Sequence, residues 1–359
     1  MKLQVTEQMN SAPETVCMSS VTGSSERVQH LNTGWKFKLG NASGAENIFY
    51  DDSLWDLVNL PHDFSITQPF TTSGEAQSAY KLGGEAWYRK TFQVDQECKN
   101  KCFRLDFDGV YMDSTVWING HLLGTHPYGY SPFAFDITQY IKLSEYNTIT
   151  VRVNTQVPNS RWYSGAGIGR DVDLIVTHPI YVQKDGVKIT TPNLASELGG
   201  NASVQLTTTV VNSLQTAVSA QIKQIIYLCG ETPEQKIASA NTERSIGAGS
   251  TDTFTVAAIT TEAPKLWDIT NPHLYVVRTQ VLVDKNIVDT YETTFGFRFF
   301  SFDAQKGFSL NGKRIKIKGV CLHQDQGALG SVSYADAVNR QIQILKHMGV
   351  NAIRTSHNT

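Results

Sequence analysis

The stretch Gly349-Val350-Asn351-Ala352-Ile353-Arg354-Thr355-Ser356-His357-Asn358-Thr359 decides how the last part of this chain folds. A short apolar run in it leads into two polar residues, Arg354 and His357, and a segment with helical spacing comes before it. This order is typical of α/β units in which polar side chains gather at the carboxyl tip of a strand, where such enzymes assemble their active sites. The stretch therefore predicts a parallel α/β domain with Arg354 and His357 at its mouth.

The segment before this stretch predicts a helix from Ser333 to Met348. Ser333 is expected to cap the helix with Asp336 as its capping-box partner, and Gly349 is expected to end it. One face collects the apolar residues at helical spacing, Val338, Ile342 and Leu345. An apolar strand over 319–322 precedes the helix, so strand, helix and strand follow in the order that starts a parallel α/β domain.

A second polar cluster, His323-Gln324-Asp325, directly follows the strand over 319–322. In a (β/α)8 barrel the carboxyl tips of all strands face one mouth, so this cluster and Arg354 would be neighbours. An arginine there can hold a carboxylate through paired bonds, and a histidine with an aspartate can bind vicinal hydroxyls of a sugar. Spacing alone leaves a plainer alternative open, in which Arg354 and His357 belong to a surface loop and His323 is a structural histidine.

Residues 31–177 are predicted to form short strands separated by turns. Apolar and polar residues alternate with a period of two at 102–107 and again at 149–153. Residues 115–118 lead into Asn119-Gly120, the dipeptide that best tolerates two consecutive positive φ values, which predicts a tight hairpin. The pattern indicates one antiparallel sandwich of roughly 150 residues, of jelly-roll type.

A second β unit is predicted over 180–299. Strand-like runs recur in it at spacings that suit an immunoglobulin-like sandwich of about 100 residues, although the paired cysteines of antibody domains are absent. After residue 300 a hairpin turned at Asn311-Gly312 leads into the strand over 319–322.

The composition is that of an ordinary globular protein, with 40% hydrophobic and 18% charged residues. The formal net charge of -2 gives no electrostatic reason to expect nucleic acid or an anionic membrane as a partner. No window approaches the ~18 consecutive apolar residues of a transmembrane helix. Residues 1–26 are polar, lack the apolar core of a secretory signal and are expected to be a disordered leader or what remains after a signal has been removed. They do not decide the compartment, and a periplasmic or secreted location is favoured over a cytoplasmic one.

The five cysteines are too few and too scattered for a disulfide framework. Cys98 and Cys102 flank a polar loop, and the sequence leaves open whether they pair or remain two thiols in a turn. A metal site at these two cysteines is disfavoured because no histidine or further cysteine lies nearby. We assign no metal ligand in this chain.

Four stretches, in this order along the chain, resemble glycoside hydrolase family 2, the family of β-galactosidases, β-glucuronidases and β-mannosidases. Residues 161–172 (RWYSGAGIGRDV) resemble the end of its sugar-binding domain, and residues 266–275 (LWDITNPHLY) a turn of its immunoglobulin-like domain. Residues 318–330 (KGVCLHQDQGALG) and 351–358 (NAIRTSHN) resemble the opening of its barrel. Within the family, the form His-x-Asp-x-Gly-Ala-Leu-Gly at 323–330 is most similar to β-galactosidases.

The resemblance implies a mostly β fold in four parts. These are a disordered leader at 1–26, a jelly-roll sugar-binding β sandwich at 27–180, an immunoglobulin-like β sandwich at 181–300, and at 301–359 the truncated βαβ start of an incomplete (β/α)8 barrel, the TIM-barrel catalytic domain.

The resemblance also implies retaining hydrolysis by two glutamates. One protonates the leaving oxygen and the other attacks the anomeric carbon, with the two carboxyl groups ~5–5.5 Å apart. In the family both lie downstream of the Arg-Thr-Ser-His motif, the acid/base in an Asn-Glu pair, so both are expected beyond Thr359. We therefore assign no catalytic residue here and expect residues 1–359 alone to be inactive.

The resemblance implies supporting roles for four substrate-binding residues, His323, Asp325, Arg354 and His357. Arg354 matches the arginine that contacts the nucleophile, the two histidines match residues that hydrogen-bond the sugar, and Asp325 is expected to bind a hydroxyl at the non-reducing end. The loop around Asn159, Arg161 and Trp162 is expected to reach over the barrel mouth. A core or hinge role for Trp162 is the alternative.

The function expected is that of the N-terminal part of an exo-β-glycosidase, a β-galactosidase that takes oligosaccharides or other β-galactosides. A β-glucuronidase or β-mannosidase is the alternative within the family, and a non-catalytic carbohydrate-binding protein is the alternative class. The strand-helix-strand start of a barrel favours the enzyme, because a binding module has no need for it. The resemblance names no certain cofactor and leaves open a divalent or monovalent metal ion in the complete active site, as well as a homo-oligomer.

Overall fold

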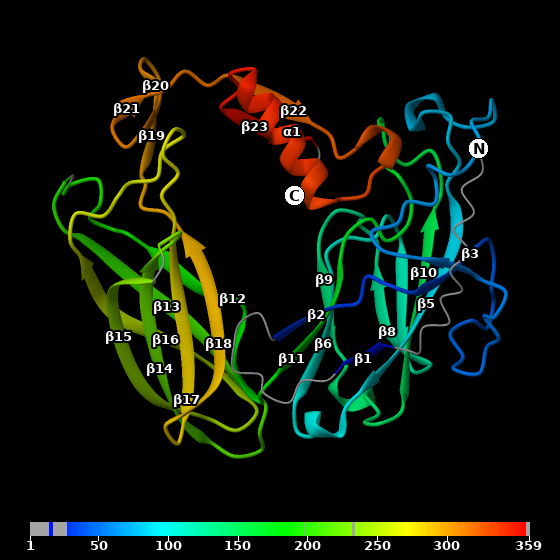
Figure 1. Ribbon diagram of the computed structural model, residues 1–359, viewed down its shortest axis with the longest axis horizontal. Coiled ribbons are helices and arrows are strands. Elements are labelled where there is room, and N and C mark those ends of the chain that lie inside the picture. The colour runs from blue at the N-terminus through cyan, green and yellow to red at the C-terminus, as the bar shows by residue number, and fades with distance from the viewer. Residues whose placement is uncertain (1–13, 17–26, 198, 232–233, 357–359) are drawn as a thin grey trace.

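The computed structural model describes residues 14–16, 27–197, 199–231 and 234–356. Within them, an antiparallel sandwich, a second antiparallel sandwich and a short α/β segment follow one another along the chain. Figure 1 shows the two sandwiches side by side, with the α/β segment lying across one end of both. The predicted fold class, mostly β with two sandwiches followed by strand, helix and strand, is confirmed.

The first sandwich consists of a seven-stranded and a four-stranded sheet. The larger sheet has the order β4 (Asp56–Val58), β3 (Trp35–Leu39), β5 (Gly84–Val94), β10 (Tyr146–Thr155), β7 (Ser114–Ile118) and β8 (His121–His126). In addition, β1 (Glu14–Val16) pairs in parallel with β5. The smaller sheet has the order β2 (Val28–His30), β11 (Val172–Thr177), β6 (Cys102–Phe107) and β9 (Phe133–Asp136).

Period-two alternation places one face of each strand in the core between these sheets. Along β10, for example, Ile149, Val151 and Val153 are fully buried. They pack in one cluster with large aromatic side chains such as Trp35 and Phe107. Burial of apolar area at about 25 cal/mol per Å² makes this cluster the main stabilising contribution to the first sandwich.

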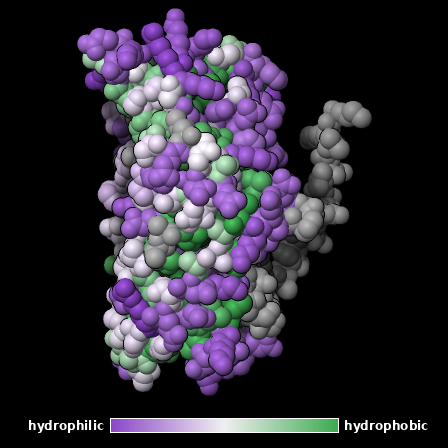
Figure 2. Space-filling view, turned by 90° about the vertical axis from the view of Figure 1, so that its left-hand side faces the viewer, coloured by the Kyte–Doolittle hydropathy of each residue, from purple (hydrophilic) through white to green (hydrophobic). Residues whose placement is uncertain are grey.

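The second sandwich places a three-stranded sheet on a four-stranded one. The sheets have the orders β12 (Ile180–Thr190), β13 (Ala202–Asn212), β16 (Ser250–Thr261) and β15 (Gln235–Ile246), β14 (Val218–Leu228), β17 (Tyr275–Val283), β18 (Asn286–Phe295). Two apolar clusters fill the space between them. Figure 2 views the molecule from the side of the second sandwich and shows polar residues interspersed with separate apolar patches on the surface.

The α/β segment begins with a small antiparallel sheet of β19 (Phe300–Asp303), β20 (Gly307–Leu310) and β21 (Lys313–Arg314). It continues with β22 (Gly319–Leu322), α1 (Ala335–His347) and β23 (Ala352–Thr355), and β22 pairs with β23 in parallel. Short 3-10 helices lie elsewhere in the chain, at η2 (Ala76–Ser78), η3 (Gln96–Cys98), η4 (Thr138–Tyr140) and η5 (Gly327–Leu329).

Two predicted hairpin turns are confirmed. Asn119 and Gly120, with φ of 51° and 82°, join β7 to β8, which pair antiparallel. Asn311 and Gly312, with φ of 50° and 76°, join β20 to β21 in the same way. Two consecutive positive φ values are the requirement of the tight turn that matches the twist of a hairpin.

The start of α1 differs from the prediction, and its end agrees with it. Its N-cap residue is Tyr334 and makes no side-chain capping bond, so the prediction of Ser333 as the cap is wrong. Gly349 ends the helix with a φ of 83°, and its N–H donates to the carbonyl of Lys346 at 3.0 Å. The N–H of Val350 reaches back to Leu345 at 3.0 Å, completing a Schellman motif.

Two expectations concern segments outside the sandwich cores. Of the leader predicted at 1–26, only Glu14–Val16 lie among the described residues, where they pair in parallel with β5. Cys98 and Cys102 are both described, and no disulfide joins them.

A buried ion pair joins the segment before β2 to the second sandwich. Arg27 Nη1 lies 3.2 Å from Asp289 Oδ2, and the two side chains are 4% and 1% exposed. Arg27 also donates to the carbonyl of Val182 at 3.1 Å, and the N–H of Val182 donates to Asp289 at 2.7 Å. Burial lowers the pKa of Arg27 and raises the pKa of Asp289, while each partner's charge acts in the opposite direction.

We expect Arg27→Ala to lower the free energy of unfolding by about 3–5 kcal/mol, because it leaves the Asp289 carboxylate buried without its cation. Urea denaturation of residues 1–359 measures this change. The matched control is the double variant Arg27→Met with Asp289→Leu, which removes both charges and should recover part of the loss, since the bonds of both side chains to Val182 are lost as well. A loss below about 1 kcal/mol in the single variant would mean that the pair behaves like an exposed one.

Candidate functional site

The tips of β22 and β23 lie level with each other. The two strands pair in the register Cys321 with Arg354 and Leu322 with Thr355. Beyond this pair, the N–H of Ser356 donates to the carbonyl of Leu322 at 3.0 Å. Because parallel strands point the same way, the residues that follow both tips lie at one edge of the sheet.

The structure brings three of the four predicted site residues to this edge. His323 follows β22 directly and is half-buried, Asp325 lies two residues further on and is exposed, and Arg354 belongs to β23 and is exposed. His357 lies outside the described residues.

Arg354 points to the open face of the two-stranded sheet. Its Nη1 donates to Ser356 Oγ at 2.9 Å and lies 3.7 Å from Cys321 Sγ. Cys321 and Arg354 are register partners, so their side chains share one face, and the side chains of Leu322 and Thr355 lie on the other. The hydrogen bonds from Ser356 and Arg354 lower the pKa of the Cys321 thiol.

The first sandwich contributes the loop around Trp162 to the same edge. The Trp162 and His323 rings lie with their centroids 6.0 Å apart, and Trp162 Nε1 donates to the Tyr130 hydroxyl at 3.1 Å. Gln324 Nε2 also donates to the Tyr130 hydroxyl, and to the carbonyl of Ser164 at 3.1 Å. This loop therefore lies against the residues that follow β22.

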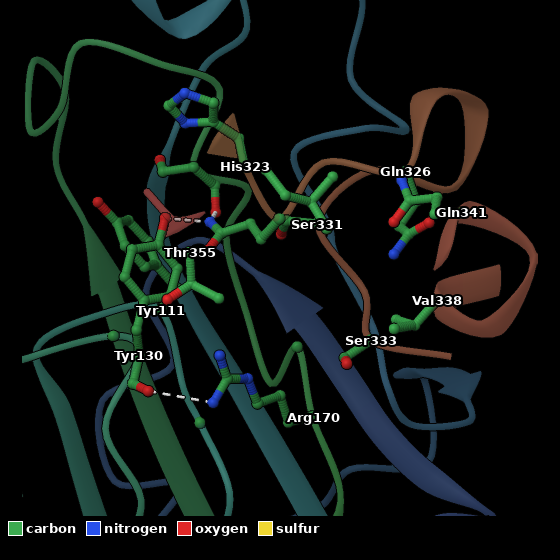
Figure 3. Close-up of a pocket in the computed structure, with 16 residues that line it drawn as sticks. Tyr111, Tyr130, Arg170, His323, Gln326, Ser331, Ser333, Val338, Gln341 and Thr355 are labelled. Carbon is green, nitrogen blue, oxygen red and sulfur yellow. Dashed lines mark hydrogen bonds between the residues drawn. The ribbon is translucent and has the colours of Figure 1, made fainter. Parts of the chain in front are cut away.

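A cavity of about 140 Å³ lies where the first sandwich meets the α/β segment. Figure 3 shows Tyr111, Tyr130 and Arg170 of the sandwich on one side, with Ser331, Ser333 and residues of α1 opposite. Arg170 Nη1 donates to the carbonyls of Tyr130 and Asp108 at 3.1 and 3.3 Å. Leu322 and Thr355 line this cavity, and so does the predicted site residue His323. The cavity therefore lies on the face of the two-stranded sheet opposite to Arg354.

A buried carboxylate that the sequence analysis did not consider, Asp63, lies beside this cavity. It is 2% exposed, and its oxygens accept hydrogen bonds from the first sandwich and from the residues after β22. Burial and the Asp63 charge raise the pKa of Tyr163, whose hydroxyl donates to this carboxylate at 2.6 Å. The sequence signal that could have revealed Asp63 is an acidic residue within the apolar segment Leu60-Pro61-His62-Asp63-Phe64.

The arrangement at the strand tips can bind and orient a polar ligand. The guanidinium of Arg354 can hold a carboxylate, and the imidazole of His323 and the carboxylate of Asp325 can hydrogen-bond hydroxyl groups. Residues 319–325 and 352–359 contain no glutamate, so these tips do not supply the two carboxyl groups of glycoside hydrolysis.

Metal and membrane features were sought over the part of the chain that the structure describes. There, no group of three or more His, Cys, Asp or Glu side chains is arranged to hold a metal ion. In the same residues no helix is both long and apolar enough to cross a membrane.

Family models match this chain in three consecutive segments. Residues 28–183 match the sugar binding domain of glycosyl hydrolases family 2, residues 185–298 match the model named for the family itself, and residues 304–358 match its TIM barrel domain. The chain belongs to glycoside hydrolase family 2. In the terms of this family the first sandwich is the sugar-binding domain, the second is the immunoglobulin-like domain, and β22, α1 and β23 belong to the barrel.

Known members of the family are similar over most of this chain. Beta-galactosidase BoGH2A of Bacteroides ovatus is 42% identical over 346 residues, which are 95% of this chain and 40% of that protein. A putative beta-glucuronidase of Formosa agariphila is 36% identical over 92% of this chain and 31% of that protein. A solved family 2 structure from Bacteroides cellulosilyticus has a TM-score of 0.88 at 35% identity and covers 92% of this chain and 43% of that one. The chain thus spans less than half the length of these relatives.

The lowered pKa of Cys321 makes its reactivity testable against Cys229. Both thiols are exposed, but burial and the charge of Glu292 raise the pKa of Cys229. Because the thiolate is the nucleophile, we expect Cys321 to react with iodoacetamide at a lower pH than Cys229 does. Peptide mass spectrometry of residues 1–359 alkylated between about pH 6 and pH 9 measures both rates.

Arg354→Gln provides the control for this prediction, because it removes the neighbouring positive charge. The pH midpoint of Cys321 alkylation should then move up toward that of Cys229, which should itself stay unchanged. Equal midpoints for the two thiols in the wild-type chain would contradict the assignment.

Proposed function

We propose that this chain forms the first part of a retaining exo-β-glycosidase that hydrolyses terminal β-galactosides. The observation that carries the proposal is the level placement of His323, Asp325 and Arg354 at the tips of two parallel strands. The family and the 42% identity to a beta-galactosidase support the reaction and the sugar. The alternative sugar is a β-glucuronide, since a relative at 36% identity is named as a putative beta-glucuronidase.

In this proposal Arg354 holds the nucleophilic carboxylate of the complete barrel. A guanidinium on the inward face of β23 keeps that carboxylate ionised and oriented, because an opposite charge within a few ångströms favours the charged form. Its present contact with Ser356 leaves other N–H donors of the fork for a second partner. The glutamates themselves would come from barrel strands that follow Thr359.

His323 and Asp325 hold the sugar in the proposed site. They follow the tip of β22, where an imidazole and a carboxylate can hydrogen-bond neighbouring hydroxyls of a terminal pyranose. We propose the same role for His357, which follows the tip of β23 in sequence. Hydrogen bonds that shorten as the ring distorts raise the rate more than they raise the affinity.

We expect residues 1–359 not to hydrolyse an aryl β-galactoside, because the two-step route needs two glutamates at a barrel mouth. The longer natural protein that carries this chain should hydrolyse it. Release of the aryl group by both proteins, with an aryl β-glucuronide in parallel, tests the reaction and the sugar together. Turnover by purified 1–359 that disappears on mutating a glutamate within it would overturn the domain assignment.

In the longer protein we expect Arg354→Ala to lower kcat by about 100-fold or more, since the nucleophile loses its ionic partner. In residues 1–359 the same change should alter the free energy of unfolding by no more than about 0.5 kcal/mol, because Arg354 is exposed. Steady-state kinetics and thermal unfolding measure the two effects. A large loss of stability in residues 1–359 would show that Arg354 is a structural anchor instead.

A further inference from the structure

Asp63 connects three segments that are far apart in the sequence. Oδ1 accepts the N–H of Ser65 at 2.9 Å and the N–H of Ala166 at 3.0 Å. Oδ2 accepts the Tyr163 hydroxyl at 2.6 Å and the N–H of Ser331 at 2.9 Å. A buried carboxylate satisfied by several donors is far more stable than one left without them, so these segments are held together as a set.

Two glycines allow this close approach. A Cβ at Gly165 would lie 1.7 Å from Ser331 Oγ, and a Cβ at Gly330 would lie 2.3 Å from Asp63 Oδ2. Both glycines also have positive φ, +69° and +73°, which other residues rarely adopt. At these glycines the backbone of each segment therefore lies directly against a side chain of the other, Gly165 against Ser331 and Gly330 against Asp63.

The loop that follows β22 is consequently fixed at both ends. At its start, Gln324 is bonded to the Tyr130 hydroxyl and to the carbonyl of Ser164. At its end, Ser331 is bonded to Asp63, and the N–H of Ser333 donates to the carbonyl of Gly169 at 3.0 Å. Between these anchors the N–H of Gln326 donates to the carbonyl of Gly330 at 2.7 Å and closes the loop on itself.

We propose that Asp63 is a positioning residue that fixes the loop over 323–333, and with it the ligand-binding side chains of His323 and Asp325, against the sugar-binding domain. This inference rests on the proposed function, because it assigns these two side chains to the sugar. Asp63 touches neither the sugar nor the reacting atoms. It acts through the backbone of Ser331 at one end of the loop, and the sugar-binding domain thereby sets the geometry of the first barrel loop.

Asp63→Asn tests this positioning role of Asp63 directly in residues 1–359. The amide keeps the shape of the side chain but places an NH2 group where an oxygen now accepts hydrogen bonds, so one set of donors loses its partner. We expect amide hydrogen exchange in 323–333 to become at least about tenfold faster, with β14 and β17 unchanged. Unchanged exchange in 323–333 would overturn the proposal.

Asp106→Asn is the matched control. Asp106 is a buried carboxylate of the same domain, 4% exposed, and it binds Arg104 and Lys184, away from the α/β segment. We expect it to leave exchange in 323–333 as in the wild type. Equal acceleration by both variants would mean that any loss of stability in this domain loosens the loop, and the proposal would fail.

Tyr163→Phe keeps the test decisive if Asp63→Asn does not fold. It removes one donor to Asp63 and leaves the carboxylate and the backbone in place. Exchange in 323–333 should rise about threefold or more, the effect of losing one of several hydrogen bonds. Exchange in 323–333 at the wild-type rate in this variant would overturn the proposed role of Asp63.

In the longer protein, Asp63→Asn should lower kcat/KM by about 10- to 100-fold, because small displacements of a binding group are costly in the transition state. Asp106→Asn should leave kcat/KM near the wild-type value, and an equal loss in both variants would count against a positioning role. If the wild-type protein hydrolyses neither the β-galactoside nor the β-glucuronide, the proposed function fails. The hydrogen-exchange measurements then test the positioning role of Asp63 by themselves.

Discussion

The arrangement of this chain depends on a buried carboxylate whose oxygens require hydrogen-bond donors from the protein. Asp63 is almost wholly removed from water, and a carboxylate in that position is tolerated only when hydrogen bonds replace its hydration. Its own turn supplies one donor, and the others come from the loop over 163–166 and from Ser331. Satisfying one side chain therefore fixes the relation between the sugar-binding domain and the start of the barrel.

This dependence matters because the start of the barrel has little core of its own. The described apolar clusters belong to the two sandwiches and their surface, whereas α1 has no buried residue. Apolar side chains of the helix, such as Ile342 and Ile344, are 44% and 42% exposed. A two-stranded sheet with one helix buries too little apolar area to order itself. It is held against the sugar-binding domain by the hydrogen bonds of Gln324, Ser331 and Ser333, and Val332 between the two serines is only 4% exposed.

The sequence predicted the features that depend on a few neighbouring residues. The turns at Asn119-Gly120 and Asn311-Gly312 and the helix end at Gly349 each follow from positions that need positive φ. The ends of β22 and β23 followed from the order strand, helix, strand along the chain and from the spacing of the apolar residues. The prediction that Ser333 caps the helix was wrong because the backbone N–H of Ser333 donates to the carbonyl of Gly169, more than a hundred residues away. This contact sets the path of the chain into the helix. Asp63 escaped notice for the same reason, since its bond to Ser331 spans 268 residues.

The two faces of the β22–β23 sheet have different surroundings. On one face Arg354 and Cys321 are exposed. On the other face Leu322 and Thr355 line the cavity against the sugar-binding domain. His323 also lines this cavity, so side chains of that domain such as Arg170 lie on the same side as one proposed site residue and across the sheet from Arg354. A change in this part of the sugar-binding domain acts on His323 by contact, and on Arg354 by displacing the strands or the loop that joins β22 to α1. Substitutions there should be judged by the geometry they impose on that loop and by their contacts with His323.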